Sequence, residues 1–434
     1  MIMQLDAFDA GDGAVLLLAK RAAGSSLDVP SNAVNVGVGT CQEGKEVSDM
    51  ERIQPAMQGY IDEGKIAGIS TVAIRQGEII HSGCYGMLDI EAGKPLQPDS
   101  IFRIYSLTKP ITAVALLMLI EEGSLELDDP ISKYFPKLGQ VKVYSSSAEG
   151  ESTFEEIERE ITIWHLLTHT SGLAYGYGVD AHPVEKMYQA AGFFSDIVTL
   201  QMSLEEITLK LADLPLAAQP ETVWRYSIAY DLIGHLIQVI TDKPFDVFLQ
   251  ERIFEPLEMI DTGFFVPEEK QQRFGAMYSR PEEGQISVVD KPGDSPFLDP
   301  DIAPSGGVGL VSTMSDYAHF LTMLINGGQW GHVRLVARDT VRQMTSNHLT
   351  GGQFPVRFGH PWPGMGYGLG VGVQTEHLPE AGWPAGTFGW IGISGVRAWV
   401  FPKESASIIA MPQARFYFEP ADAFQKLAYE AIRD

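Results

Sequence analysis

Apolar positions first show a helical spacing near residue 50 of this chain. From Met50, "MERIQPAMQGYIDEGKIAG" repeats apolar residues about every three to four positions, which predicts an amphipathic helix. The next stretch, "ISTVAIRQGEIIHSGCYG", has two β-rich runs around Gln76-Gly77 and predicts a hairpin. Residues 1–48 show weak periodicity and many small or polar residues. They are expected to form a loosely attached N-terminal extension, to which we assign no role.

The strongest apolar run lies in the segment from Ser106 to about Gly123. It contains "ITAVALLMLI" and ends at a glycine, which predicts a buried central helix. Residues 124–290 contain several helical patterns and few strand patterns, separated by loops with glycine and proline. Within them, the acidic segment 145–160, "SSSAEGESTFEEIERE", is interpreted as a solvated surface loop that runs into a helix.

After residue 300 the pattern changes to short, glycine-rich β runs, and the sequence closes with the helix-like "ADAFQKLAYEAIR". Strand patterns at both ends with helices between them predict one sheet built from both termini and an inserted helical domain. The predicted α/β domain comprises residues 49–123 and 291–434, and the mostly helical domain comprises residues 124–290. A chain of 434 residues has the length of about two domains.

Composition and charge narrow the possible functions. With 45% hydrophobic and 20% charged residues, the chain is typical of globular proteins. The 31 basic and 56 acidic residues give a net charge of −25, which repels nucleic acids and anionic membrane surfaces. We therefore expect no nucleic-acid partner. Two cysteines, Cys41 and Cys84, form neither a disulfide framework nor the spacing of a zinc site.

The apolar runs are too short to predict a membrane segment. "ITAVALLMLI" falls well below the ~18 apolar residues that a spanning helix needs. "AVLLLAK", residues 14–20, is short and follows acidic residues instead of the basic ones that begin a secretory signal. The sequence therefore predicts no membrane span and a cytoplasmic protein.

A serine and a lysine stand three positions apart in "YSLTKP", where the central helix is predicted to begin. Positions i and i+3 share one helix face, so Ser106 and Lys109 can form a hydrogen bond. A lysine whose pKa is lowered by burial can take the proton of a serine and make it nucleophilic. The helix N-terminus also favours negative charge. Because Ser-x-x-Lys arises by chance in many chains, the pair needs support from its context.

That context is a series of further motifs in a fixed order. "IFRIYSLTKPITAVALLMLIEEGSLELDDPISKYFP" is followed by "TIWHLLTHTSGL", "WRYSIAYDLIGHLI", "PSGGVGLVSTMSDYAHF" and "FGWIGISGVRAWVFP". From about Ile53 onward, the chain resembles the serine β-lactamase-like superfamily, which includes penicillin-binding proteins, and it is most similar to family VIII carboxylesterases. The resemblance implies an α+β fold of the α/β sandwich type, in which helices flank an antiparallel sheet. It also implies an active site in the cleft between the two domains.

The second motif of that superfamily is Tyr-x-Asn, and this chain has Tyr226-Ser227-Ile228. By the resemblance, Tyr226 takes or relays the proton of Ser106 and then protonates the leaving group. Whether Tyr226 or Lys109 is the base stays open, and a tyrosine with a purely structural role is the alternative. Ile228 replaces the asparagine that holds the amide of β-lactams and peptides, which favours esters.

The third motif is Lys-Thr-Gly in lactamases and Trp-Gly-Gly in many related esterases, and this chain has Trp390-Ile391-Gly392. Trp390 removes a cation and is expected to offer an apolar wall to the substrate, which again favours neutral esters. By the resemblance, Trp390 and Gly392 belong to the substrate-binding site. The backbone N–H groups of Ser106 and Ile393 are then expected to hold the oxyanion.

These motifs together imply a serine hydrolase that cleaves small carboxylic esters, with short acyl chains, through an acyl-enzyme on Ser106. No metal or cofactor is implied. One alternative is an acyltransferase (transesterase), or a weak β-lactamase or peptidase, on the same fold. A catalytically silent ligand-binding module is the alternative from another class.

Other patterns carry less weight. His165 and His169 have the i, i+4 spacing of metal ligands but lack an H-E-x-x-H motif, so they are interpreted as structural. Gly306-Gly307-Val308-Gly309 lacks the residues of a P-loop and predicts a tight turn where backbones approach closely. The α/β-hydrolase motif G-x-S-x-G does not occur in the sequence, and the near match around Ser394 is interpreted as a turn.

Overall fold

The computed structural model describes residues 49–146, 151–176, 182–193, 202–280, 285–378 and 383–433. The predictions for residues 1–48 and for Cys41 lie outside the described residues. Within them, no helix is long and apolar enough to cross a lipid bilayer.

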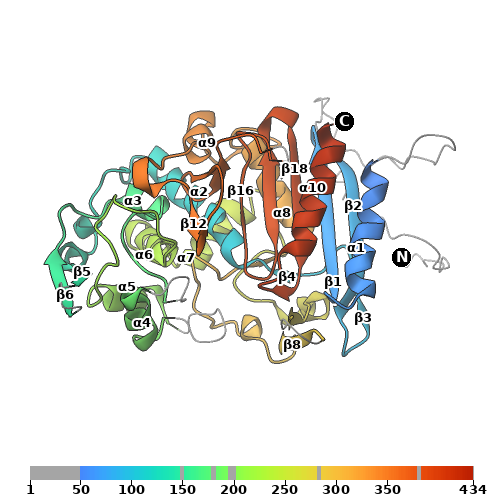
Figure 1. Ribbon diagram of the computed structural model, residues 1–434, viewed down its shortest axis with the longest axis horizontal. Coiled ribbons are helices and arrows are strands. Elements are labelled where there is room, and N and C mark those ends of the chain that lie inside the picture. The colour runs from blue at the N-terminus through green and yellow to red at the C-terminus, as the bar shows by residue number, and fades with distance from the viewer. Residues whose placement is uncertain are drawn as a thin grey trace, which may run out of the picture.

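An eight-stranded antiparallel sheet forms the centre of one half of the molecule (Figure 1). Its order is β14 (Met365–Tyr367), β15 (Gly372–Gln374), β16 (Phe388–Ile391), β17 (Arg397–Phe401), β18 (Ala406–Pro412), β1 (Gly68–Arg75), β2 (Glu78–Asp89) and β3 (Lys94–Pro95). The first and last parts of the described chain meet where Ile69 of β1 pairs with Pro412 of β18. The prediction of one antiparallel sheet built from both ends is confirmed.

The hairpin predicted around Gln76-Gly77 joins β1 to β2. Gln76 has a φ of 55° and Gly77 a φ of 81°, so both residues have the left-handed backbone that two-residue hairpin turns require. Every residue of β18 is buried, and so is nearly every residue of β1. Because successive side chains of a strand point to opposite faces, both faces of the sheet are covered at this position.

Three helices provide that cover. Helices α1 (Ile53–Asp62) and α10 (Glu419–Arg433) contact each other and pack on one face of the sheet at β1, β2 and β18. Helix α8 (Met314–Ile325) packs against β1, β17 and β18 from the other face (Figure 1). The sheet is therefore the middle layer of a three-layer sandwich.

The predicted central helix is α2 (Thr108–Glu121), and all of its residues from Thr108 to Leu119 are buried. It begins later than the sequence suggested, because Ser106 lies in a preceding 3₁₀ turn, Tyr105–Leu107. Tyr105 has a φ of 43°, a left-handed conformation that costs a non-glycine residue about 1–3 kcal/mol. This strained residue turns the chain from β4 (Phe102–Arg103) into the segment that carries Ser106.

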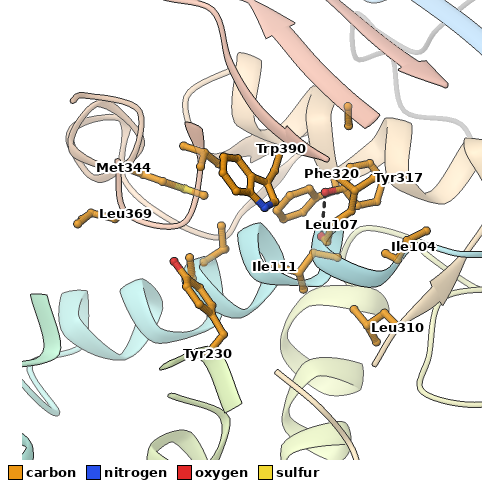
Figure 2. Close-up of a cluster of buried hydrophobic side chains, with 14 of the residues drawn as sticks. Ile104, Leu107, Ile111, Tyr230, Leu310, Tyr317, Phe320, Met344, Leu369 and Trp390 are labelled. Carbon is orange, nitrogen blue, oxygen red and sulfur yellow. Dashed lines mark hydrogen bonds between the residues drawn. The ribbon is translucent and has the colours of Figure 1, made fainter. Parts of the chain in front are cut away.

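Aromatic and aliphatic side chains surround the first turn of α2 (Figure 2). The hydroxyl of Tyr317 donates a hydrogen bond to the carbonyl of Leu107 at 2.9 Å, which ties α8 to the 3₁₀ turn. Figure 2 also shows Trp390 lying over this part of the helix, near Leu107 and Ile111. The segment that carries Ser106 is thus fixed by packing from the sheet and from α8.

The region predicted to be mostly helical contains α3 (Ile163–Leu167), α4 (Pro183–Ala190), α5 (Leu204–Leu211), α6 (Ala229–Thr241) and α7 (Phe245–Leu249). Helix α6 packs against α2 and connects this region to the nucleophile segment. Helix α9 (Arg338–Met344) follows later. The smaller strands are β7 (Met277–Ser279), β8 (Ser287–Asp290), β9 (Val311–Ser312), β10 (Gln329–Trp330), β11 (Val333–Arg334), β12 (Arg357–Phe358), β13 (His360–Pro361) and β19 (Ala414–Arg415).

The described residues of the acidic segment 145–160 are largely exposed, as expected, but the predicted secondary structure is wrong. Strands β5 (Lys142–Ser146) and β6 (Ser152–Glu156) form a hairpin there, where a loop and a helix were expected. Tyr144 and Phe154 face each other across it, with ring centroids 6.1 Å apart. All five residues of β6 are exposed and Phe154 is its single apolar residue, so no alternation of apolar and polar positions marks this strand.

Candidate active site

Ser106 lies between the end of β4 and the start of α2, with only 5% of its surface exposed. Its Oγ accepts a hydrogen bond from the Tyr226 hydroxyl at 2.8 Å and another from the Lys109 amine at 3.2 Å. Three of the residues proposed from the sequence therefore meet at one oxygen atom. Tyr226 reaches it from the loop that precedes α6, far away in the chain.

Lys109 lies in the first turn of α2 and is fully buried. Its Nζ donates to Ser106 Oγ, to the Gly307 carbonyl at 2.9 Å and to Tyr175 Oη at 3.3 Å. All three acceptors are neutral oxygens. The cation also lies 4.5 Å from the ring centroid of Tyr226, within the range of a cation–π interaction.

Burial decides the charge of this lysine. Desolvation lowers the pKa of Lys109 to about 7, and the negative charge of Asp231 acts in the opposite direction. The positive end of the α2 dipole also disfavours a cation at this position. At neutral pH, Lys109 can therefore both accept and donate a proton.

Trp390 lies in β16, and its indole N–H donates a hydrogen bond to Tyr226 Oη at 3.3 Å. Its side chain is fully buried, so it does not form the exposed apolar wall that we expected. Other aromatic rings cover the Trp390 side chain. Phe358 lies 6.0 Å and Trp362 6.2 Å from the Trp390 ring. Since a donor to the phenolic oxygen favours the ionised form, Trp390 can act on Tyr226 through its N–H.

The hairpin of β12 and β13 brings apolar surface to the reacting groups. The ring of Phe358, at the end of β12, lies 5.0 Å from that of Tyr226, and both side chains are partly exposed. Tyr175 stacks on Tyr226 at 5.3 Å with an angle of 19° between the rings. The hydroxyl and amine groups at Ser106 are thus enclosed by aromatic rings, which lowers the local dielectric and strengthens their hydrogen bonds.

Gly392 brings the end of β16 against the nucleophile segment. A Cβ atom at Gly392 would lie 2.6 Å from the Ile104 carbonyl oxygen and 3.4 Å from the Ser106 nitrogen, so a side chain is excluded there. The next residues form a turn, in which Ser394 Oγ donates to the carbonyl of Arg103 at 3.0 Å. This arrangement holds the turn beside Ser106. The pairing of the Ser106 and Ile393 N–H groups as oxyanion donors stays a prediction.

Ile228, which stands in the place of the asparagine, is fully buried at the start of α6. Its backbone N–H donates to the carbonyl of Ala174 at 3.1 Å. The side chain therefore packs in the core and offers no polar group to a ligand at Ser106.

The family can be stated from a comparison with known sequences. The sequence profile described as Beta-lactamase matches residues 52–429, which is most of the chain. The chain belongs to the β-lactamase family. The superfamily and fold predicted from the motifs are therefore confirmed.

Two curated relatives and one solved structure are similar to this β-lactamase-family chain. "Protein Rv1367c" of Mycobacterium tuberculosis is 35% identical over 368 residues, which cover 82% of this chain and 88% of the relative. "Esterase EstB" of Burkholderia gladioli is 30% identical over 360 residues, covering 79% and 85% of the two chains. The solved structure of "EstCE1, a hydrolase with promiscuous acyltransferase activity" has a TM-score of 0.75 at 25% identity, covering 89% of this chain and 99% of that chain.

Sequence reasoning missed two residues at the site of this β-lactamase-family protein. Tyr175 was missed because no spacing rule links a tyrosine in a loop to Ser106. Gly307 lies in the turn that was predicted only to allow close approach of backbones. That approach is confirmed, since a Cβ atom at neighbouring Gly306 would lie 2.2 Å from the Tyr230 carbonyl oxygen.

The two histidines considered as metal ligands have local partners. His165 Nδ1 accepts from the backbone N–H of Thr162 at 3.0 Å, and His169 Nδ1 lies 3.1 Å from Ser227 Oγ. His169 is fully buried beside Tyr226, and burial holds its pKa well below the usual value, so it is neutral. Over the described ranges, no group of three or more His, Cys, Asp or Glu side chains has the arrangement of a metal site.

Proposed function

We propose that this chain is a serine hydrolase that cleaves carboxylic esters through an acyl-enzyme on Ser106. The observation that carries the proposal is the pair of hydrogen bonds from Lys109 and Tyr226 to Ser106 Oγ. A serine hydroxyl held by two groups that can exchange protons, at an almost fully buried position, has the arrangement of an activated nucleophile.

In the proposed reaction, Ser106 Oγ attacks the ester carbonyl carbon and passes its proton to Tyr226 or Lys109. The resulting oxyanion is held by the backbone N–H groups of Ser106 and Ile393, and one such donor typically contributes about 3–4 kcal/mol. Collapse of this intermediate breaks the bond to the alcohol, which leaves with the proton. Water then attacks the acyl-enzyme by the same route and releases the acid.

Neutral esters are preferred over lactams and peptides in this proposal. The buried Ile228 offers no partner to an amide side chain, and Trp390 stands where lactamases carry a cation. The naming of EstB as an esterase supports the same choice. We expect short acyl chains, because the rings of Phe358 and Tyr175 pack against Tyr226, which holds the nucleophile.

Acyl transfer to an alcohol is the second candidate function. The aromatic rings of Phe358 and Tyr175 around Tyr226 favour it, because apolar surface can bind the hydrocarbon part of an alcohol and gives water no comparable contact. The reported acyltransferase activity of EstCE1 supports this candidate as well. A preference for an added alcohol over water as the acyl acceptor would establish transfer.

The test of the nucleophile is Ser106→Ala, assayed with p-nitrophenyl acetate and butyrate. We expect turnover to fall by about 10⁴-fold or more, as for other activated serines. A fluorophosphonate should label the wild type at Ser106 and leave this variant unlabelled. Ser132→Ala is the matched control, since Ser132 bonds to Glu160 at an exposed position. Undiminished hydrolysis in Ser106→Ala, or an adduct on Ser394, would contradict the proposal.

A further inference from the structure

A buried carboxylate near Lys109 is left out of the mechanism so far. Asp231, in the first turn of α6, is fully buried. Its Oδ1 accepts a short hydrogen bond of 2.5 Å from Ser305 Oγ, whereas its Oδ2 has no side-chain donor among the described residues, and the backbone N–H of Gly307 also acts on the carboxylate. A buried carboxylate with so few donors is costly and requires an explanation.

The glycine turn after Ser305 connects this carboxylate to the lysine. The carbonyl of Gly307 accepts from Lys109 Nζ, and that of Gly306 accepts from Thr112 Oγ1 at 2.7 Å. An ideal Cβ atom at Gly307 would lie 2.9 Å from Asp231 Oδ2 and 3.4 Å from Lys109 Nζ. Asp231 Oδ2 and the ammonium thus flank the same point, and the glycine leaves this space free of a side chain.

We propose that Asp231 is the buried counter-ion of Lys109, a positioning residue that sets the pH at which Ser106 becomes reactive. Ser305 holds its carboxylate in place, and the absence of a side chain at Gly307 leaves the two charges facing the same space without a direct ion pair. This inference rests on the proposed role of Lys109 in handling the proton of Ser106.

The other groups that face Lys109 carry no negative charge to compete with this role. They are the hydroxyls of Ser106 and Tyr175, the rings of Tyr226 and Tyr230, and the neutral imidazole of His169. Among the described residues, Asp231 is the carboxylate that acts on the charge of Lys109. Burial raises the pKa of Asp231, and Ser305 and Lys109 lower it. The pair is therefore mutually dependent.

The direction of the effect follows from charge. A nearby anion favours the ammonium form, so removing it lowers the pKa of Lys109. If neutral Lys109 is the base, reactivity rises with pH through this pKa. If charged Lys109 stabilises a Tyr226 phenolate, reactivity is lost as pH rises through it. The limb of the pH–rate profile that follows the ionisation of Lys109 moves to lower pH in both cases. The test therefore does not depend on whether Lys109 or Tyr226 is the base.

The experiment compares wild type with Asp231→Asn, which keeps the shape of the side chain and removes the charge. The rate of fluorophosphonate labelling at Ser106 and kcat/KM for p-nitrophenyl butyrate are measured from about pH 5 to about pH 10. We expect the limb to move to lower pH by about one unit or more. Ser305→Ala, which removes the donor to Asp231, should move it less in the same direction.

Asp316→Asn is the matched control. Asp316 is also a buried aspartate, with a pKa raised by burial to about 6, but its carboxylate accepts hydrogen bonds from the backbone N–H of Asp261 and from the Thr262 hydroxyl. It should leave the limb unchanged.

An Asp231→Asn profile that loses rate at every pH without moving would overturn the inference, because a merely structural residue behaves in that way. If this variant does not fold, an unmoved limb in Ser305→Ala overturns it equally. Should the wild type label at Ser106 without hydrolysing esters, the proposed ester hydrolysis is wrong. The shift of the labelling profile still decides the role of Asp231 in that case.

Discussion

Two fully buried cations, Arg103 and Lys109, lie on either side of Ser106 and have opposite surroundings. Arg103 Nε donates to the carboxylate of Asp290 at 2.6 Å, and its other nitrogens reach the carbonyl of Gly275 at 2.6 Å and Ser295 Oγ at 3.1 Å. Its guanidinium also stacks 4.0 Å from the Phe274 ring centroid. This charge is completely compensated.

Lys109 has no such compensation at contact distance. Its three acceptors are neutral oxygens, and its carboxylate, Asp231, faces the same space beside Gly307 without a direct ion pair to it. Arg103 and Lys109 therefore have different roles, although they lie in one short segment of the chain. A paired cation stabilises the fold, while a poorly compensated one keeps a pKa near neutrality, where it can exchange protons.

The largest effect should come from Lys109→Met, which keeps the bulk of the side chain and removes its charge. We expect kcat/KM for p-nitrophenyl butyrate to fall by roughly 10²–10⁴-fold, the usual contribution of proton transfer. The urea unfolding midpoint should fall less than in Arg103→Met, because Lys109 makes no direct ion pair and the buried Asp231 keeps its hydrogen bond from Ser305. An active variant, or one with a strongly lowered midpoint, would make Lys109 resemble Arg103 and break the comparison.

Arg103→Met should have the reverse profile. Removing one partner of a buried ion pair leaves Asp290 uncompensated, so the free energy of unfolding should fall by about 3–5 kcal/mol in urea titrations. The double variant Arg103→Met/Asp290→Leu is the control, and it should recover much of the loss because no unpaired charge remains. A single variant as stable as the wild type would show that this ion pair is not the structural one.

The difference in stability between the wild type and Lys109→Met should also change with pH. Burial lowers the pKa of Lys109 from 10.5 to about 7 in the folded state, so between these values the unfolded chain binds more protons. The free energy of unfolding of the wild type, relative to Lys109→Met, should therefore increase as pH rises from about 7 towards 10.5. Urea titrations of both proteins at several pH values measure this difference, and a constant difference would contradict the lowered pKa.

The smallest effect is expected for Trp390→Phe, which keeps an aromatic ring and removes the N–H donor to Tyr226. One hydrogen bond contributes about 0.5–1.5 kcal/mol, so kcat should fall by up to about tenfold with little change in KM. In a Tyr226→Phe background the same substitution should have no further effect on turnover. Additive losses would show that Trp390 acts independently of Tyr226.

Apolar patterns predicted those parts of the fold that bury one or both faces. The central helix α2 and the β1–β2 hairpin have clear patterns, because their residues meet a core. The hairpin of β5 and β6 could not be predicted in this way, since β6 is exposed on both faces and its polar residues show no alternation. The left-handed Tyr105 has no local signature either, because packing around Ser106 imposes its conformation.

At the site, the motifs placed Ser106, Lys109 and Tyr226 together, and the structure joins them by hydrogen bonds. What the sequence left out depends on approach in three dimensions. Tyr175 reaches Lys109 from a loop. The sequence around Asp231 predicts only an ordinary polar residue of a helix. No spacing along the chain encodes such contacts.

The pairing of Ile69 with Pro412 also has a consequence for biosynthesis. On the ribosome, β1 emerges early, but the strand that covers its free edge is translated near the end. Until then, the nascent chain exposes an unpaired apolar strand, which is prone to aggregation. A topology with such long-range strand pairing favours slow folding and a longer exposure to aggregation.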